Sequence, residues 1–132
     1  ALESVKAWNL RTGQVEWELT EDSVAGKWAV TCVALNPANK DVLAAGYEDG
    51  SVRLWSIAGR NVLVQFNGHK TAVTCLQFDV QNMRLASGGR DSDIVIWDLV
   101  LETGLMRLQG HTGGITALRF LLEGTFLISA AR

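Results

Sequence analysis

The sequence predicts an all-β fold in which one four-stranded antiparallel unit is repeated. Three observations support this prediction. The chain matches itself when it is shifted by 42 residues. Short apolar runs alternate with turn residues throughout, and Asp49-Gly50 is a strong signal for a tight hairpin. No stretch of useful length shows the 3.6-residue apolar period of a helix.

Matching pairs of residues carry the internal repeat. Gly68-His69 corresponds to Gly110-His111, and Trp55 corresponds to Trp97, in each case 42 residues later. Trp8 lies 47 residues before Trp55, which indicates a longer connection early in the chain. A period of about 42 residues, with a Gly-His pair and a later Trp-Asp, is typical of the four-stranded blades of a β-propeller.

The turn residues divide the chain into twelve expected strands. In chain order these span residues 3–10, 14–19, 29–35, 41–46, 51–57, 61–67, 72–79, 83–88, 93–99, 105–109, 114–120 and 125–130. With the four strands of a blade counted from inner to outer, the chain opens with the third and outer strands of one blade. Two full blades and the first two strands of a fourth blade follow. The expected blade parts are therefore 1–19, 29–67, 72–109 and 114–132.

The apolar patterns separate strands that are covered on both faces from strands that are wetted on one. Residues 94–97 are all apolar, as expected for a strand sandwiched between neighbouring blades. Residues 14–19 alternate, with Val15, Trp17 and Leu19 on one face, as expected for an outer strand. Propellers use about four to eight blades, so we expect this chain to be an arc of a longer protein, with unpaired strand edges.

Composition and charge narrow the function classes. Twelve Lys and Arg residues balance fourteen Asp and Glu residues, which argues against a basic domain that grips nucleic-acid phosphates. No apolar run is long enough to span a membrane, and no signal peptide is visible. Cys32 and Cys75 both follow Val-Thr and form no CxxC pair, so we interpret them as reduced, buried thiols rather than metal ligands.

One blade carries a full set of four polar residues: His69, Ser87, Asp91 and Trp97. The pattern of Gly-His, Ser-Gly, a turn Asp and Trp-Asp resembles that of the WD-repeat family, and in that family the four side chains form a buried hydrogen-bond network. Chemically, Asp91 can accept from the His69 ring, and Ser87 can bridge to the Trp97 indole N–H. A catalytic Ser-His-Asp triad is the alternative, and the recurrence of the histidine at His111 disfavours it.

The other blades depart from this pattern. Before the first full blade, Gly26-Lys27 stands where Gly-His is expected, and Ala45 replaces the serine. We therefore expect this blade to lack the network and to rely on apolar packing. The last half blade retains a partial network, His111 and Ser129.

Two further features concern the surface. Trp28, in a loop before an inner strand, is a candidate interaction residue, with packing over a blade seam as the alternative. The arginines are scattered among acids and predict a solvated surface rather than an RNA-binding track; they are Arg11, Arg53, Arg60, Arg84, Arg90, Arg107 and Arg119.

A narrower resemblance rests on residues 43–56, 66–70, 84–99 and 104–111, above all the Tyr-Glu-Asp-Gly turn and the Asp-x-Asp-Ile-x-x-Trp-Asp stretch. These segments resemble the N-terminal propeller of the WD-repeat subunit family of the small-subunit processome, the particle assembled around the U-three small nucleolar RNA. The resemblance implies a non-catalytic scaffold in the nucleolus that supports ribosomal RNA processing and small-subunit biogenesis.

The partners implied by this resemblance are other proteins of a large assembly, with direct or indirect contact to small nucleolar RNA or pre-ribosomal RNA. No cofactor, membrane or small-molecule substrate is expected. The alternative is a WD-repeat adaptor for signalling or ubiquitin-ligase substrate recognition, which could be cytoplasmic. An enzyme is disfavoured because the sequence offers no nucleophile elbow, metal-spaced ligands or phosphate loop.

Overall fold

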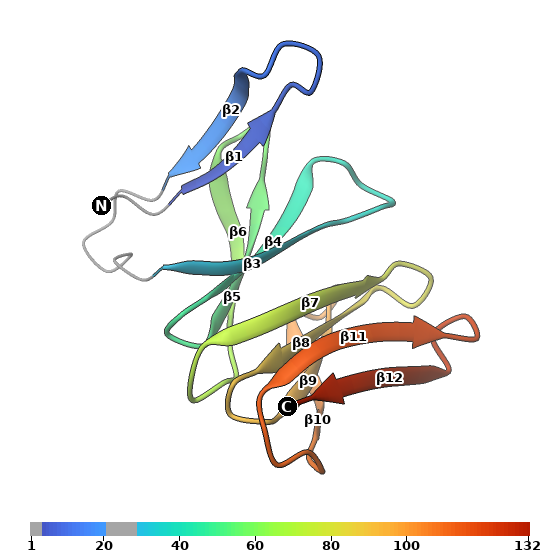
Figure 1. Ribbon diagram of the computed structural model, residues 1–132. Helices are drawn as coiled ribbons and strands as arrows, with labels where there is room; N and C mark the ends of the chain where they lie inside the picture. Colours follow the sequence, from blue (N-terminus) through green and yellow to red (C-terminus); the bar gives the residue numbers. More distant parts are fainter. Residues whose placement is uncertain (1–3, 21–28) are drawn as a thin grey trace.

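The structure is a computed structural model that describes residues 4–20 and 29–132. Within these ranges it contains twelve strands and no helix (Figure 1). Every strand overlaps an expected one, and the boundaries differ by at most two residues. The strands are β1 (Ser4–Trp8), β2 (Val15–Thr20), β3 (Val30–Leu35), β4 (Val42–Tyr47), β5 (Ser51–Ser56), β6 (Asn61–Asn67), β7 (Val73–Asp79), β8 (Arg84–Gly89), β9 (Ile94–Asp98), β10 (Thr103–Leu108), β11 (Ile115–Leu121) and β12 (Phe126–Ala131).

The strands form four antiparallel sheets. Two sheets have four strands, in the orders β3-β4-β5-β6 and β7-β8-β9-β10, and two sheets have two strands, β1-β2 and β11-β12. Figure 1 shows the sheets following one another, from β1-β2 at the top to β11-β12 at the bottom. This arrangement confirms the predicted fold class, a propeller arc of two full blades and two half blades.

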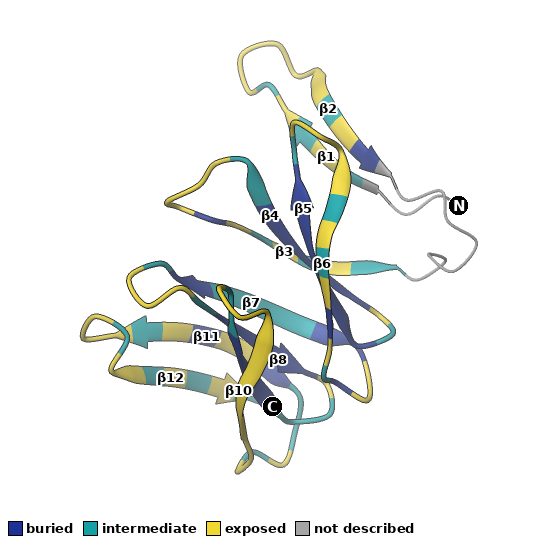
Figure 2. Cartoon of the chain, turned by 180° about the vertical axis from the view of Figure 1, so that it is seen from behind, coloured by how far each residue is buried: buried dark blue, intermediate teal, exposed yellow. Residues whose placement is uncertain are grey.

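Burial is concentrated in the second and third strands of the full blades (Figure 2). All six residues of β5 are buried, as are residues 94–97 of β9, which confirms that these strands are covered on both faces. The outer strand β6 alternates between exposed and covered residues, and every residue of β10 is exposed. The apolar run at residues 94–97 thus correctly marked a strand covered on both faces, whereas the inner strand β3 alternates between half-buried and exposed residues, as the outer strand β6 does.

Arg53 contradicts the prediction that the arginines lie on a solvated surface. It lies on β5 and is only 4% exposed. Its guanidinium carbon lies 4.4 Å from the centroid of the Tyr47 ring. Burial is tolerable because β5 is covered on both faces and a guanidinium stacks favourably on an aromatic ring.

Apolar side chains fill the three seams between successive sheets. Between the two full blades, Phe66 of β6 stacks on Trp97 of β9, with ring centroids 4.6 Å apart. At the β1-β2 end, Leu19 packs with residues of β4 and β5. At the other end, Ile115 and Leu118 of β11 pack with residues of β8 and β9. Each blade therefore stabilises its neighbours.

Hydrogen bonds also cross the seams, and they join residues about one repeat apart. On the inner strands, the Thr31 hydroxyl donates to the Val73 carbonyl, and the Thr74 hydroxyl donates to the Ile115 carbonyl. Farther out, Arg84 donates to the Gly124 carbonyl, with Nη2 and O 2.6 Å apart. The Thr of each Val-Thr-Cys triplet is therefore a link between blades.

The third and outer strands share an irregularity that identifies equivalent tryptophans. The ladder of β1 with β2 shifts register between Ala7 and Trp8, and that of β5 with β6 shifts between Leu54 and Trp55. The ladder of β9 with β10 shifts next to Trp97, on the β10 side. Trp8, Trp55 and Trp97 thus occupy the same position of three blades.

Candidate functional site

The four polar residues of the second full blade meet inside the sheet. His69 comes from the loop before β7, Ser87 from β8, Asp91 from the turn after β8, and Trp97 from β9. The Trp97 indole Nε1 donates to Ser87 Oγ at 2.9 Å. Ser87 Oγ lies 2.7 Å from His69 Nε2, and His69 Nδ1 lies 3.2 Å from Asp91 Oδ1. We call these four residues the blade network.

A single proton arrangement satisfies the blade network with a neutral histidine. Because Trp97 can only donate, Ser87 Oγ accepts from it and uses its own proton for His69 Nε2. His69 Nδ1–H then donates to the Asp91 carboxylate. The network therefore joins the loop before β7 to β8, β9 and the turn between them, and no buried polar group of the four lacks a partner.

Backbone groups hold Asp91 in its charged form. Burial raises the pKa of Asp91, but hydrogen bonds from the Lys70 N–H, the His69 ring and the Asp93 N–H outweigh it, so the pKa lies below its ordinary value. The Lys70 nitrogen lies 2.9 Å from Asp91 Oδ2, and the Asp93 nitrogen lies 3.2 Å from Oδ1. Asp91 thus fixes the two loops that flank the blade network.

The glycines next to the network are required by space. A Cβ on Gly89 would lie 2.4 Å from Asp91 Oδ1 and 2.5 Å from His69 Nδ1. A Cβ on Gly68 would lie 2.5 Å from the Trp97 ring. The Gly of the Gly-His pair therefore leaves room for the tryptophan.

The geometry of Ser87, His69 and Asp91 has the order of a hydrolytic triad, but its accessibility does not suit one. Ser87 is completely buried, and its oxygen already accepts the Trp97 N–H. A nucleophile must reach the carbonyl of a substrate, which these contacts prevent.

The first full blade uses a different partner for its tryptophan. The Trp55 indole Nε1 donates to the Tyr47 hydroxyl at 3.1 Å, and Asp49 accepts from the backbone and hydroxyl of Ser51 at 2.9 and 2.6 Å. The expectation that this blade relies on apolar packing therefore missed a polar contact. Its sequence signal is Tyr47, which stands 42 residues before Gly89. In the second full blade, His69 leaves no space for a side chain at Gly89. The first full blade has no histidine at that place, so the equivalent position can hold the tyrosine.

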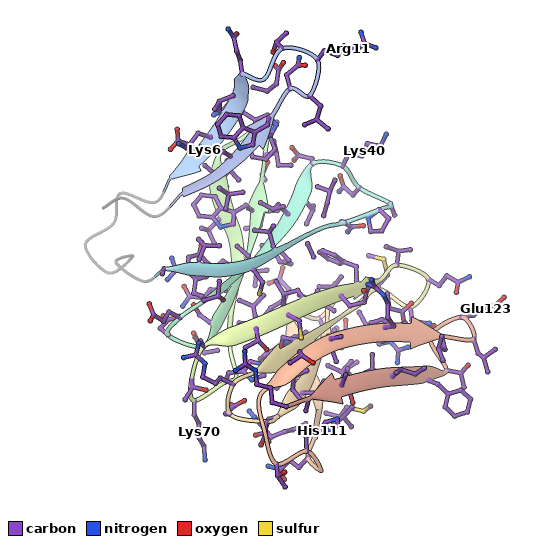
Figure 3. All side chains as sticks on the ribbon, in the orientation of Figure 1. Lys6, Arg11, Lys40, Lys70, His111 and Glu123 are labelled. Carbon is purple, nitrogen blue, oxygen red and sulfur yellow. The ribbon has the colours of Figure 1, made fainter. Side chains whose placement is uncertain are left out.

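The remaining predicted residues divide into two groups. His111 and Ser129 meet in the last half blade, with His111 Nε2 2.7 Å from Ser129 Oγ, and Figure 3 shows His111 beside the end of β12. Trp28 lies outside the described residues, so its predicted role as an interaction residue stays a prediction.

The thiols and acids of the described chain do not form a metal site. Cys32 and Cys75 are free, and no group of three His, Cys, Asp or Glu residues gathers within residues 4–20 and 29–132. Burial raises the pKa of Cys32 to about 11 and also raises that of Cys75. Both thiols therefore stay protonated near neutral pH and are weak nucleophiles. A helix able to cross a membrane is likewise not found in the part of the chain that the structure describes.

Sequence comparison identifies the family. The profile of the WD domain, G-beta repeat, matches residues 21–56, 60–98 and 103–132, which together are more than half of the chain. The chain belongs to the WD-repeat family of β-propellers. The blade network and the Trp-Asp at the end of β9 are the residues that carry this membership here.

The curated relatives include one protein named for a small nucleolar RNA and others named for their WD repeats. The U3 small nucleolar RNA-associated protein 12 of Saccharomyces cerevisiae is 39% identical, over 64% of this chain and 10% of its own length. A WD repeat-containing protein 3 homolog of Dictyostelium discoideum is 33% identical, over 54% of this chain and 7% of its own length. The chain thus spans about a tenth or less of the length of these relatives.

A solved structure shares the fold almost throughout. A chain in the crystal structure of the Mitotic Checkpoint Complex superposes with a TM-score of 0.81 and 26% identity. The match covers 97% of this chain and 38% of the other chain. This superposition supports the propeller architecture that the sheet order shows.

Proposed function

We propose that this chain is a non-catalytic protein-interaction scaffold in a nucleolar particle that processes ribosomal RNA and assembles the small ribosomal subunit. The observation that carries the proposal is the 39% identity with the yeast U3 small nucleolar RNA-associated protein 12. The proposal assigns this chain to the nucleus and nucleolus, with other proteins of the particle as its partners.

The surface of the described residues supports contact through proteins. Large apolar side chains are exposed at equivalent positions of the two outer strands, Leu63 on β6 and Leu105 on β10, and apolar surface of this kind favours protein partners. The formal charge of −2 gives no electrostatic footprint for gripping RNA. Contact with small nucleolar RNA or pre-ribosomal RNA would then be made largely through the partner proteins.

Affinity purification of the tagged protein from growing cells tests this proposal. We expect enrichment of U3 small nucleolar RNA together with small-subunit assembly proteins, and we expect the proteins to stay bound after ribonuclease treatment. A double variant, Leu63→Glu with Leu105→Glu, places charge on the two exposed outer strands and should reduce recovery, while Leu10→Glu, in the β1-β2 turn, is the control and should not.

An adaptor for signalling or ubiquitin-ligase substrate recognition is the second candidate. The observation that favours it is the close superposition on a chain of the Mitotic Checkpoint Complex, which is an assembly unrelated to ribosomes by its name. Recovery of a ubiquitin-ligase core or a signalling complex without U3 RNA would overturn the nucleolar proposal and support the adaptor.

A further inference from the structure

The turn between β9 and β10 differs from two equivalent turns of the same chain. Each of the three turns joins the third strand of a blade to its outer strand, and a residue near its end has a positive φ: Gly13 at 74°, Arg60 at 55° and Glu102 at 58°. The two residues before that position form the tip, and they are Arg11-Thr12, Ala58-Gly59 and Val100-Leu101. The first two tips are thus charged, polar or small, whereas the third carries two large aliphatic side chains.

The backbone of this turn does not require aliphatic residues at its tip. Asp98 Oδ1 accepts from the N–H groups of Val100 and Leu101, with distances of 2.8 and 2.9 Å. In the β1-β2 turn, Asn9 Oδ1 accepts from both N–H groups of the tip in the same way, at 2.8 and 3.2 Å. Because a charged and polar tip forms the same turn, the aliphatic side chains have another explanation.

The aliphatic tip joins a third exposed apolar side chain. Val100 and Leu101 are 68% and 69% exposed, and Met83 of the β7-β8 turn is 47% exposed. The Leu99 N–H donates to the Met83 carbonyl at 2.9 Å, which holds the two turns together. Residues 58–60 of the first full blade are also exposed, although a complete blade follows them, so exposure is a property of this turn position. We call Met83, Val100 and Leu101 the turn patch.

Met83 is an unfavourable residue for its place in the chain. Its φ of 52° lies in the left-handed region, which costs free energy for a residue with a long side chain and suits glycine or asparagine better. Its counterpart in the first full blade is Asp41, whose carbonyl accepts from Ile57 as that of Met83 accepts from Leu99. The Asp41 carboxylate supports its own blade by accepting from Ser56 Oγ at 2.8 Å. Neither backbone preference nor burial accounts for a methionine at this position.

Acidic side chains flank the turn patch. Glu102 is exposed at the end of the β9-β10 turn, and Glu123 is exposed on the β11-β12 turn, from which it points outward in Figure 3. Asn82 Nδ2 donates to the Glu123 carbonyl at 2.9 Å and so holds that turn beside the β7-β8 turn. The positive charge of Arg84 is balanced within the chain, because its Nη2 lies 2.6 Å from Asp79 Oδ2. The rim of the turn patch is therefore acidic.

The β9-β10 turn offers side chains to a partner rather than backbone donors. The N–H group of Leu99 donates to the Met83 carbonyl, and those of Val100 and Leu101 donate to Asp98. An added β-strand needs free backbone donors and acceptors along an edge. A helix satisfies its own backbone and presents an apolar residue every three or four positions, so it suits this surface better.

We propose that the turn patch binds a basic amphipathic helix of a partner protein. The apolar face of the helix covers Met83, Val100 and Leu101, and its Lys or Arg side chains pair with Glu102 and Glu123. The acidic rim disfavours RNA and anionic membranes, because it repels their phosphates. This inference rests on the proposed role as a protein-interaction scaffold and adds the chemistry of one bound segment. It does not depend on the nucleolar location.

Photo-crosslinking in cells identifies the bound segment. The intact protein carries a benzophenone amino acid in place of Leu101, which is exposed and can accept it without disturbing the core, and the cross-linked peptides are sequenced by mass spectrometry. We expect a segment of another protein with apolar residues at helical spacing and a net positive charge. Cross-links to RNA or lipid, to an acidic segment or to one without this spacing would overturn the proposal, as would no cross-link from either Leu101 or Met83.

A synthetic peptide of the cross-linked segment measures what each part of the surface contributes, by fluorescence anisotropy. Val100→Ala with Leu101→Gly copies the tip of the first full blade. It should weaken binding by about tenfold or more and leave the unfolding midpoint nearly unchanged. Glu102→Arg copies Arg60 at the equivalent φ and should weaken binding less, while reducing its dependence on salt. Arg11→Ala, at the equivalent tip of the β1-β2 turn, is the matched control and should change nothing. Wild-type affinity in the Val100→Ala, Leu101→Gly variant would refute the proposal.

These measurements separate this inference from the proposed function. If the wild-type protein recovers U3 small nucleolar RNA but the double variant binds the peptide normally, only the turn-patch inference fails. If the peptide binds as expected but no U3 RNA is recovered, only the nucleolar assignment fails.

Discussion

The two full blades solve one packing problem with two chemistries. Each buries a third-strand tryptophan whose indole N–H needs an acceptor. In the β7–β10 blade the acceptor is Ser87, which is supported in turn by His69 and Asp91. In the β3–β6 blade it is the Tyr47 hydroxyl. Each blade therefore provides a hydrogen-bond acceptor for the buried indole N–H of its tryptophan. The complete four-residue network is one of at least two arrangements that provide this acceptor.

The two sets of hydrogen bonds also differ in the structural elements that they connect. Tyr47 and Trp55 lie on strands of one sheet, so their bond ties β4 to β5. The blade network ties two strands to the loop before β7 as well. We therefore expect changes to the network to loosen a loop, and changes to Tyr47 to stay within the sheet.

Removal of the third-strand tryptophan should lower the free energy of unfolding more than any other change, and by a similar amount in both blades. Trp97→Ala and Trp55→Ala are each expected to destabilise the chain by about 3–5 kcal/mol, as large-to-small changes of buried aromatic residues do. Urea unfolding at one fixed protein concentration measures this. A loss at Trp97 much larger than at Trp55 would mean that the network, and not the ring packing, dominates.

Reciprocal substitutions at the equivalent positions Ser87 and Ala45 should distinguish the two hydrogen-bond arrangements. Ser87→Ala leaves the Trp97 N–H and the His69 ring with one partner fewer and is expected to cost about 1–3 kcal/mol. The reciprocal variant Ala45→Ser adds a hydroxyl at the equivalent buried position of the other blade. It should not stabilise, since Trp55 already donates to Tyr47. Thermal unfolding compares the two, and a stabilised Ala45→Ser would contradict this account.

Acid should affect the two blades differently through Asp91. Because its pKa is lower in the folded state than in the unfolded chain, Asp91 adds stability above its unfolded pKa of about 3.9. That contribution is lost as the pH falls through the lower folded pKa. We expect Asp91→Asn to be less stable than the wild type at pH 7, with the difference shrinking below about pH 4. Unfolding midpoints measured between pH 7 and pH 3 check this, and a constant difference would refute it.

Loss of the tyrosine hydroxyl should have the smallest effect. Tyr47→Phe keeps the ring that stacks with Arg53 and removes only the acceptor for Trp55. The expected cost is about 0.5–1.5 kcal/mol, the range for one hydrogen bond. Chemical denaturation measures it, and Ser56→Ala is a suitable comparison because it removes a hydroxyl of the neighbouring strand β5, which donates to Asp41 Oδ2 at 2.8 Å. No change in Tyr47→Phe would indicate that the indole N–H gains another acceptor.

The sequence predicted the strands and the sheet order because the repeat is long, regular and punctuated by turns. It also grouped His69, Ser87, Asp91 and Trp97, since their spacing follows the family pattern. It did not predict the hydrogen bond between Tyr47 and Trp55. The family pattern has a serine as the acceptor for the tryptophan, and a tyrosine at the position of Gly89 is not part of that pattern. Arg53 was assigned to the surface because arginine is charged. The sequence did not show that β5 is covered on both faces, or that the Tyr47 ring lies against the Arg53 guanidinium.

The threonine links between blades have a consequence for how such a chain could arise. The Thr31 hydroxyl donates to a carbonyl of the next module, and Thr74 does the same one module later. In a solitary module this bond to the neighbour would be absent, and the Thr74 hydroxyl would keep only the Gly88 carbonyl of its own blade, 3.2 Å away. The interblade hydrogen bond of the Val-Thr-Cys triplet therefore contributes only where two modules lie side by side, so its total contribution to stability grows with every module in the array.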